Sequence, residues 1–276
     1  MPLFVFDFFD KSGIIRRDFE AVMDSYFICS ESDNSTIISG DPILKRLKEE
    51  KAHKIMGGLY HEVQIRMTYN SNHIEGSCLS QEQTRYIFET KTIDTGNKAI
   101  PADDIIETIN HFRAIDYCID VAEETLSETI IKKIHYILKT GTGTEDIAWF
   151  KIGDYKLKPN MVGGIKTTEP NEVSTAIQAL LSDYLKKQNI SFEDIIDFHY
   201  NFELIHPFQD GNGRVGRLIA FKECLKHNIV PFIIEDDKKY FYYRGLREYT
   251  KASGYLINTC YDGQDVFNDL VKAFEV

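Results

Sequence analysis

The chain of 276 residues lacks any apolar run of the roughly 18 to 20 residues that a membrane-spanning helix needs. Near its start, the apolar stretch Leu3–Phe6 meets Asp7 before the core of a signal peptide could form. An apolar content of 43% with 27% charged residues is typical of a globular protein and excludes disordered and collagen-like chains. We therefore expect a cytoplasmic protein.

Cysteine is scarce and scattered. The five cysteines are Cys29, Cys78, Cys118, Cys224 and Cys260, and no two of them form a C-x-x-C pair. An odd number at irregular spacing argues against a disulfide framework and against a zinc site. This pattern is consistent with a reducing compartment.

Basic residues are outnumbered, with 32 Lys and Arg against 43 Asp and Glu, which gives a net charge of −11. Such a charge disfavours adhesion to nucleic-acid phosphates and to anionic lipid. We expect neither a nucleic-acid nor a membrane partner. Any anionic ligand must therefore be held by a local basic site.

Helical periodicity dominates the sequence from Pro42 onward and predicts a mainly α fold. The expected helices cover about 42–73, with a break at Gly57-Gly58, then 80–90, 101–119, 127–138, 170–188, 191–206 and the segment after Gly213. The polar segment Asp94–Lys98 is the predicted boundary between an N-terminal region, 1–95, and a core with C-terminal helices, 96–276.

The stretch from Trp149 to Thr168 breaks the helical pattern. Its apolar residues, its Pro159-Asn160 pair and the sequence Val162-Gly163-Gly164-Ile165 predict two short strands around a turn. The residues expected in the first strand are Phe150, Ile152, Tyr155 and Leu157.

Polar chemistry is concentrated in the twelve residues from His206 to Arg217, between two apolar helical segments. Pro207 ends the first helix, because the residue before a proline is disfavoured in the α region. Gly211 and Gly213 lack Cβ atoms, so the backbone can turn sharply and present amide N–H groups at the start of the next helix. Such a helix start attracts anions, and we interpret it as a phosphate-binding cradle.

Charged side chains flank this cradle. Arg214 and Arg217 are three residues apart, so they are neighbours on one helical face and can grip phosphates together. Asp210 would repel a bare phosphate but can bind a Mg²⁺ ion that bridges phosphate oxygens. His206 can accept a proton from an attacking hydroxyl near neutral pH.

Other nucleotide-binding motifs fit less well. Gly211-x-Gly213-x-x-Gly216 also satisfies the dinucleotide fingerprint G-x-G-x-x-G. That fingerprint follows a strand, however, whereas this segment follows a helical pattern broken by proline. A G-x-x-x-x-G-K-[ST] phosphate loop does not occur in the sequence.

The twelve residues resemble the signature of the Fic family, H-P-F-x-[DE]-G-N-G-R-x-x-R, without a mismatch. Because eight of its letters are invariant, at roughly one chance in twenty each, a random match is very improbable. Weaker landmarks extend the resemblance over about Pro101 to Leu246. They are Asn110, Ala114, Leu126-Ser127, Ile134-His135, His199 and Tyr242-Tyr243.

The resemblance implies a Fic-type helical bundle with a β-hairpin flap. It also implies an enzyme that transfers AMP from Mg-ATP to a Ser, Thr or Tyr hydroxyl of a target protein. By analogy with the family, His206 is the base, Asp210 binds Mg²⁺, Gly211, Asn212 and Gly213 line the anion hole, and Arg214 and Arg217 hold the β and γ phosphates.

Further sites follow from the same resemblance. Tyr242 and Tyr243 either border an adenine pocket or belong to the aromatic core. The residues Val162, Gly163, Gly164 and Ile165 resemble the family's flap, which docks a target by adding a strand edge to it. Lys156 stands where the family usually has arginine, and a homodimer is a further option.

Ser71 to Gly76 resembles the family's inhibitory motif, [ST]-x-x-x-E-[GN], which precedes the signature in class II members. Glu75, near a helix end and followed by Gly76, could project its carboxylate into the cradle and pair with Arg217. At about 4 Å and an effective dielectric near 20, that attraction is on the order of 4 kcal/mol before desolvation. Since ATP needs this arginine, the resemblance predicts an autoinhibited enzyme.

Several alternatives stay open. Other Fic-type enzymes transfer a phosphoryl, uridylyl or phosphocholine group. In related enzymes the inhibitory glutamate can align a water molecule that removes AMP, and self-modification is a further activity. A non-catalytic regulatory scaffold is the rival from a different class, although intact His206, Asp210 and both arginines favour an enzyme.

Overall fold

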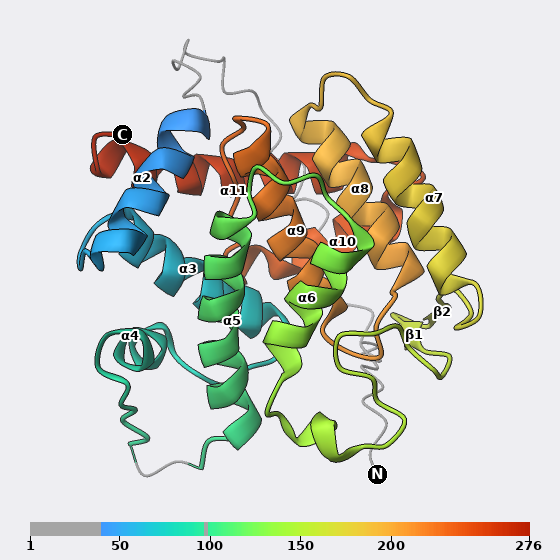
Figure 1. The fold of residues 1–276 in the computed structure, drawn as a ribbon, viewed down its shortest axis with the longest axis horizontal. Coiled ribbons are helices and arrows are strands. Elements are labelled where there is room, and N and C mark those ends of the chain that lie inside the picture. The colour runs from blue at the N-terminus through green and yellow to red at the C-terminus, as the bar shows by residue number, and fades with distance from the viewer. Residues whose placement is uncertain (1–39, 97–98) are drawn as a thin grey trace, which may run out of the picture. The chain divides into compact units, whose positions relative to one another are not determined.

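The protein is mainly helical, as the sequence predicts. The structure, a computed structural model, describes residues 40–96 and 99–276 (Figure 1). In these residues the α-helices are α2 (Gly40–His53), α3 (Leu59–Ile74), α4 (Gln81–Thr90), α5 (Ala102–Asp120), α6 (Glu128–Lys139), α7 (Val173–Leu185), α8 (Phe192–Ile205), α9 (Asn212–Lys226), α10 (Lys239–Glu248) and α11 (Gly254–Ala273). Two 3₁₀ turns, η1 (Gly143–Asp146) and η2 (Asp236–Lys238), and a hairpin of β1 (Met161–Val162) and β2 (Ile165–Lys166) accompany them. The apolar stretch Leu3–Phe6 lies outside the described residues.

Serine caps begin helices where the sequence predicts them. At α4, Ser80 Oγ accepts the N–H of Gln83 at 3.1 Å, and Gln83 Oε1 accepts the N–H of Ser80 at 2.9 Å. Ser191 and Asp194 form the same reciprocal pair at the start of α8. These contacts satisfy amide groups that have no partner within the helix.

Both predicted ends of one helix are wrong by three residues. α7 begins at Val173, not at Pro170, and ends at Leu185, not near Gln188. The N–H of Glu172 donates to the carbonyl of Glu169 at 2.9 Å. The residues around Pro170 therefore form a separate turn before the helix starts.

The predicted strand pair around Pro159-Asn160 is wrong in its position. Only residues 161–162 and 165–166 pair, and the turn lies at Gly163 and Gly164, with φ of 55° and 79°. Two successive positive φ angles suit a two-residue hairpin turn. Upstream, residues 149–160 contain no strand; the Tyr155 ring packs 5.8 Å from the Phe208 ring, and the N–H of Lys156 donates to the Pro207 carbonyl.

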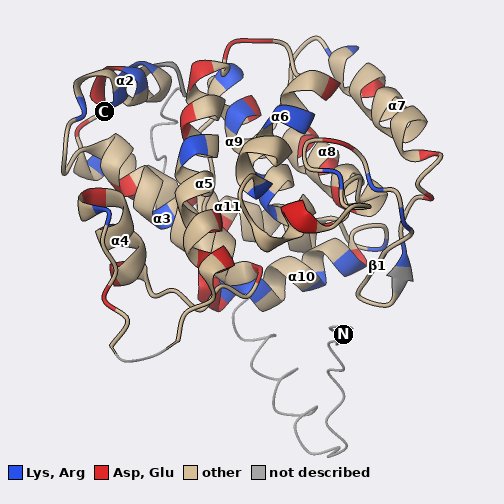
Figure 2. Ribbon diagram, turned by 60° about the horizontal axis from the view of Figure 1, so that its bottom comes forward, with Lys and Arg blue, Asp and Glu red and all other residues tan. Residues whose placement is uncertain are grey.

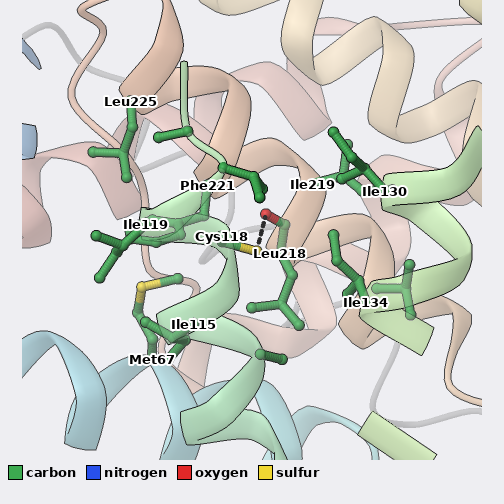
Figure 3. Packing of buried hydrophobic residues seen from close by; sticks show 14 of the residues in the cluster. Met67, Ile115, Cys118, Ile119, Ile130, Ile134, Leu218, Ile219, Phe221 and Leu225 are labelled. Atoms are coloured by element: carbon green, nitrogen blue, oxygen red, sulfur yellow. Dashed lines mark hydrogen bonds between the residues drawn. The ribbon is translucent and has the colours of Figure 1, made fainter. Parts of the chain in front are cut away.

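α9 lies at the centre of the helical unit. It contacts α2, α3, α5, α6 and α8, and most of its side chains are buried. Figure 3 shows Leu218 and Phe221 among apolar side chains of α3, α5 and α6, and the thiol of Cys118 donates to the Leu218 carbonyl at 3.6 Å. α9 is therefore buried on nearly all sides, including the positions of charged residues such as Arg214 and Arg217.

The N-terminal helices share this core. Ile43 and Leu47 of α2 and Val63 of α3 belong to the same hydrophobic cluster as residues of α5 and α9. Of the predicted boundary segment, residues 94–96 are described. The division into an N-terminal region, 1–95, and a core, 96–276, stays a prediction.

Charged residues of both signs lie along α2 and α5 (Figure 2). Local geometry therefore decides where an anion can bind, rather than the net charge of −11. Within residues 40–96 and 99–276, every helix is too short or too polar to cross a bilayer.

α11 approaches the segment after α9 closely at Gly263. The Gly263 carbonyl accepts the N–H of Ile233 at 3.0 Å, and a Cβ atom at Gly263 would lie 2.7 Å from the Ile233 carbonyl oxygen. Gly254, in the first turn of the same helix, has open space around its Cβ direction.

We expect Gly263→Ala to lower the free energy of unfolding by about 1–3 kcal/mol, because the added methyl group forces the two backbones apart. Gly254→Ala is the matched control and should leave stability unchanged or raise it by up to about 1 kcal/mol, since alanine favours a helix. Urea denaturation measures both variants. Equal midpoints for Gly263→Ala and the wild type would contradict the close approach.

Candidate functional site

His206 ends α8 and begins the loop that carries the signature. It adopts the left-handed conformation, with φ of 52° and ψ of 63°, and its N–H donates to the Phe202 carbonyl at 2.9 Å. The side chain is 16% exposed. Burial, together with the nearby charge of Lys156, lowers the pKa of His206 to about 4. The ring is therefore neutral at pH 7 and able to accept a proton.

The loop between α8 and α9 is held rigidly by its own residues. Asn212 Oδ1 accepts the N–H of Phe208 at 2.8 Å, and Asn212 Nδ2 donates to the Phe208 carbonyl at 2.9 Å. The Phe208 ring is fully buried and stacks on His135, with centroids 3.9 Å apart. Gly211 precedes α9 with φ of 79°. The first amide groups of α9 are thus fixed in place at a helix start, where anions bind.

Arg217, in the second turn of α9, is buried among polar partners. Its Nε donates to Ser71 Oγ at 3.1 Å, and its Nη2 donates to the Ser71 carbonyl at 2.9 Å and to Glu75 Oε1 at 2.7 Å. The side chain is 7% exposed. Burial alone would lower the pKa of Arg217, but the Glu75 carboxylate raises it. The pairing of Glu75 with Arg217 that the sequence predicts is therefore present in the structure.

The Glu75 carboxylate also lies over the start of α9. α3 ends at Ile74, Glu75 caps it, and Gly76 follows with φ of 98°. A Cβ atom at Gly213 would lie only 2.3 Å from Glu75 Oε1. The missing side chain of Gly213 thus makes room for an oxyanion against the helix start. The structure brings Ser71, Glu75, Gly213 and Arg217 together.

Arg214 has a partner that the sequence analysis did not predict. Its Nη1 and Nη2 both donate to the carboxylate of Glu107 on α5, the latter at 3.3 Å. Glu107 also accepts a hydrogen bond from Lys139 of α6, and Lys139 Nζ donates to Asp210 Oδ2 at 2.7 Å. Arg214 Nη2 lies 3.8 Å from the same oxygen of Asp210. We call Glu107, Lys139, Asp210 and Arg214 the four-charge cluster.

The four-charge cluster keeps Asp210 ionised. The side chain of Asp210 is half exposed, and desolvation by its neighbours would raise its pKa, but the ammonium of Lys139 and the guanidinium of Arg214 hold that pKa well below its usual range. Two cations and two carboxylates balance one another in the cluster, and so its charges compensate locally.

A further carboxyl group lies beneath the site. Glu203 Oε2 is 3.9 Å from His206 Nδ1, and a Cβ atom at Gly216 would lie 2.5 Å from Glu203 Oε1. Burial raises the pKa of Glu203 to about 8, although Arg217 opposes the shift. At pH 7 Glu203 is therefore mainly protonated and adds little negative charge beside the anion site.

Lys156 links the hairpin to the signature loop. Its Nζ donates to Asn160 Oδ1 at 2.8 Å, to Thr167 Oγ1 at 2.7 Å and to the Ile205 carbonyl at 3.3 Å. Burial lowers the pKa of Lys156 to about 8. Lysine thus anchors both sides of the hairpin at the end of α8, at the position where the Fic family usually has arginine.

The two tyrosines of α10 have different surroundings. Tyr242 is buried, and its hydroxyl lies 2.7 Å from His199 Nε2 and 3.5 Å from Arg217 Nη1. Tyr243 is 42% exposed and donates to the carbonyl of Ile74 at 2.8 Å. Tyr242 therefore contacts Arg217 and Tyr243 contacts the end of α3, and an adenine-binding role stays a prediction for both.

Asp210 is the candidate magnesium ligand, and its side chain is 53% exposed. Within the described ranges, no group of three or more His, Cys, Asp or Glu residues is arranged to hold a metal ion. Mg²⁺ in nucleotide sites is usually bound by one or two carboxylates together with phosphate oxygens. The residues present therefore fit a magnesium ion that is shared with a nucleotide.

Three charged residues beside the site escaped the sequence analysis: Glu107, Lys139 and Glu203. Each lies three or four residues from a landmark of the resemblance on the same helix, namely Asn110, His135 and His206 respectively. Residues at that spacing share one helical face. A spacing of three or four residues from a landmark is therefore the sequence signal that indicates these three charged residues.

Comparison with known proteins supports the resemblance. The model of the Fic/DOC family matches residues 125–223. The chain is 29% identical over 195 residues to "Protein adenylyltransferase Fic" of Nematostella vectensis, covering 68% of this chain and 43% of that protein. It is 28% identical over 189 residues to the protein of the same name from Aedes aegypti, covering 66% of this chain and 36% of that protein. The chain thus spans less than half the length of these curated relatives.

Solved structures share the fold. A Fic domain containing signaling protein from Bacteroides thetaiotaomicron aligns with a TM-score of 0.68 and 21% identity, over 86% of this chain and 93% of that one. Fic-1 from C. elegans aligns with a TM-score of 0.67 and 18% identity, over 94% of this chain and 74% of that one. The helical architecture is therefore that of Fic proteins. The signature loop between α8 and α9 lies within residues 125–223, which match the Fic/DOC family, so this part of the chain is a Fic domain.

Proposed function

We propose that this protein transfers AMP from Mg-ATP to a Ser, Thr or Tyr hydroxyl of a target protein, and that Glu75 inhibits this activity. The observation that carries the proposal is the carboxylate of Glu75 bound over Gly213 and against Arg217. A site that holds one oxyanion in this way suits a phosphate group of ATP. The name of the curated relatives, protein adenylyltransferase, supports the same activity.

The proposed chemistry divides among a few residues. The neutral ring of His206 removes the proton of the target hydroxyl, which then attacks the α-phosphorus of ATP. Arg217, once free of Glu75, and Arg214 hold the outer phosphates, so the pyrophosphate that leaves is neutralised where its charge develops. The amide groups at Gly211, Asn212 and Gly213 bind the phosphate oxygens. Magnesium bound at Asp210 would supply further neutralisation of the leaving group.

The hairpin is the proposed docking element for the target. Met161 and Val162 are 66% and 45% exposed, although both are apolar. A short exposed strand can add its free edge to an extended segment of another protein. Lys156, through Asn160 and Thr167, connects this edge to the end of α8, next to His206.

We expect Glu75→Gly to raise AMP transfer at least about tenfold, because removal of the carboxylate frees Arg217 for the nucleotide. The protein is incubated with labelled ATP, magnesium and a cell lysate. Labelled products, including the protein itself, are then analysed by mass spectrometry. An adduct of another mass would identify a different Fic-type transfer.

Glu82→Gln is the matched control, since Glu82 is a 62% exposed carboxylate on the neighbouring α4. It should transfer AMP at the wild-type rate. Equal labelling by Glu75→Gly and the wild type would refute the inhibitory role of Glu75.

We expect His206→Ala, made in the Glu75→Gly background, to lower AMP transfer at least about 100-fold, because the general base is lost. The melting temperature should change little, since the side chain is not part of the apolar core. His53→Ala, at an exposed histidine near the end of α2, is the control and should retain the activity. Unchanged transfer by His206→Ala would exclude His206 as the base.

The lowered pKa of His206 sets the expected pH dependence. The neutral form is the base, and its population falls only when the pH approaches the folded-state value of about 4. For Glu75→Gly we expect kcat/KM to stay within about twofold between about pH 7.5 and 5.5. A histidine with the ordinary pKa of about 6.5 would lose about 90% of its base form at pH 5.5. A midpoint near pH 6.5, in protein that remains folded, would contradict the assigned environment of His206.

A further inference from the structure

The four-charge cluster contains a cation to which the proposed reaction assigns no role. Lys139, in the last turn of α6, is only 3% exposed, and its ammonium lies between the carboxylates of Glu107 and Asp210. A buried lysine is costly unless its charge is compensated, and here two carboxylates compensate it. Lys139 is therefore held at Asp210 by the fold and does not reach it by chance from the surface.

We propose that Lys139 is an internal substitute for the divalent cation at Asp210. It holds the carboxylate in place in the nucleotide-free protein, and it makes that protein a poor binder of free magnesium. The metal then enters only together with a nucleotide. This inference rests on the proposed role of Asp210 as a magnesium ligand and deepens it.

The charge balance of the cluster supports this role. Because its two cations and two carboxylates balance, a free divalent ion finds little net attraction, and it meets the positive charges of Lys139 and Arg214. A nucleotide changes this balance because its phosphates carry negative charge. They can draw Arg214 away from Glu107, and they also neutralise the arriving metal ion.

The contacts of Glu107 explain how Lys139 can release Asp210 without leaving the interior. Glu107 accepts hydrogen bonds from both Lys139 and Arg214. When Arg214 turns to a phosphate, Glu107 still pairs with Lys139. The ammonium thus keeps one carboxylate partner when the metal takes the other, and no buried charge is left alone.

The experiment uses Lys139→Met, which removes the ammonium and keeps the apolar stem. Glu107 and Asp210 would then face the vacated space, and two carboxylates are a donor set that binds Mn²⁺ and Mg²⁺. Without any nucleotide, we expect this variant to bind Mn²⁺ at least about tenfold more tightly than the wild type, which corresponds to about 1.4 kcal/mol. Electron paramagnetic resonance of free Mn²⁺ measures the affinity.

Lys133→Met is the matched control, because Lys133 lies on the same helix but is exposed. It should bind Mn²⁺ as weakly as the wild type. Equal affinities in all three proteins would overturn the proposal. Tighter binding that persists when Asp210→Asn is added to Lys139→Met would also overturn it, because the ion would then lie elsewhere.

The wild type gives a second measurement that needs no substitution. Its affinity for Mn²⁺ should be weak alone and should rise when ADP is added, once the Mn²⁺ that ADP binds without protein has been subtracted. Tight binding without nucleotide would overturn the proposal even if Lys139→Met failed to fold, which circular dichroism detects. The Lys139→Met comparison involves neither AMP transfer nor nucleotide. The proposal for Lys139 can therefore be refuted while AMP transfer is observed, and AMP transfer can be absent while the Mn²⁺ result is as expected.

Discussion

The burial of Arg217 is the constraint on which the rest of the site depends. A guanidinium that is 7% exposed needs a negative partner, because an unpaired buried charge is strongly destabilising. Ser71 supplies oxygen acceptors without charge, and Glu203 is mainly protonated. The negative charge must therefore come from Glu75 or from a bound phosphate. The proposed inhibition and the proposed nucleotide binding would therefore compete for one place, because the arginine requires an anion there.

Both partners of this pair are fixed by apolar packing. Arg217 lies on α9, the helix at the centre of the core, and Glu75 caps α3, which shares that core. Ile74, next to Glu75, is buried in a second cluster with Tyr242, and its carbonyl accepts a hydrogen bond from Tyr243. Helix packing, rather than the attraction between the charges, therefore sets the distance between carboxylate and guanidinium. The hydrophobic contacts place the two charged groups close together, and the ion pair forms in that geometry.

The sequence predicts the parts of this site that depend on local backbone geometry. The glycines of the signature, the caps at Ser80 and Ser191 and the helix end at Glu75-Gly76 each need only a few neighbouring residues, and the structure contains them. The pairing of Glu75 with Arg217 was predicted only through the resemblance to a family. Glu107, the hydrogen-bond partner of Arg214, comes from another helix, and periodicity gives the face of a helix but not the helix that it contacts. The strand expected before Pro159 was wrong for the same reason, because Tyr155 packs on Phe208, a residue distant in sequence.

The charged side chains of Glu75 and Lys139 differ in how a bound ligand can displace them. Glu75 stands at the end of a helix, is 30% exposed and is followed by a glycine, so its carboxylate can move into water by a change in the last turn alone. Lys139 is 3% exposed and points into the cluster, where Glu107 remains as a partner after Asp210 is lost. A nucleotide can therefore displace the Glu75 carboxylate into water. The Lys139 ammonium, in contrast, can only exchange one carboxylate partner for the other. If both operate as proposed, release of Glu75 is the step at which inhibition can be regulated, and Lys139 ensures that the metal follows the nucleotide.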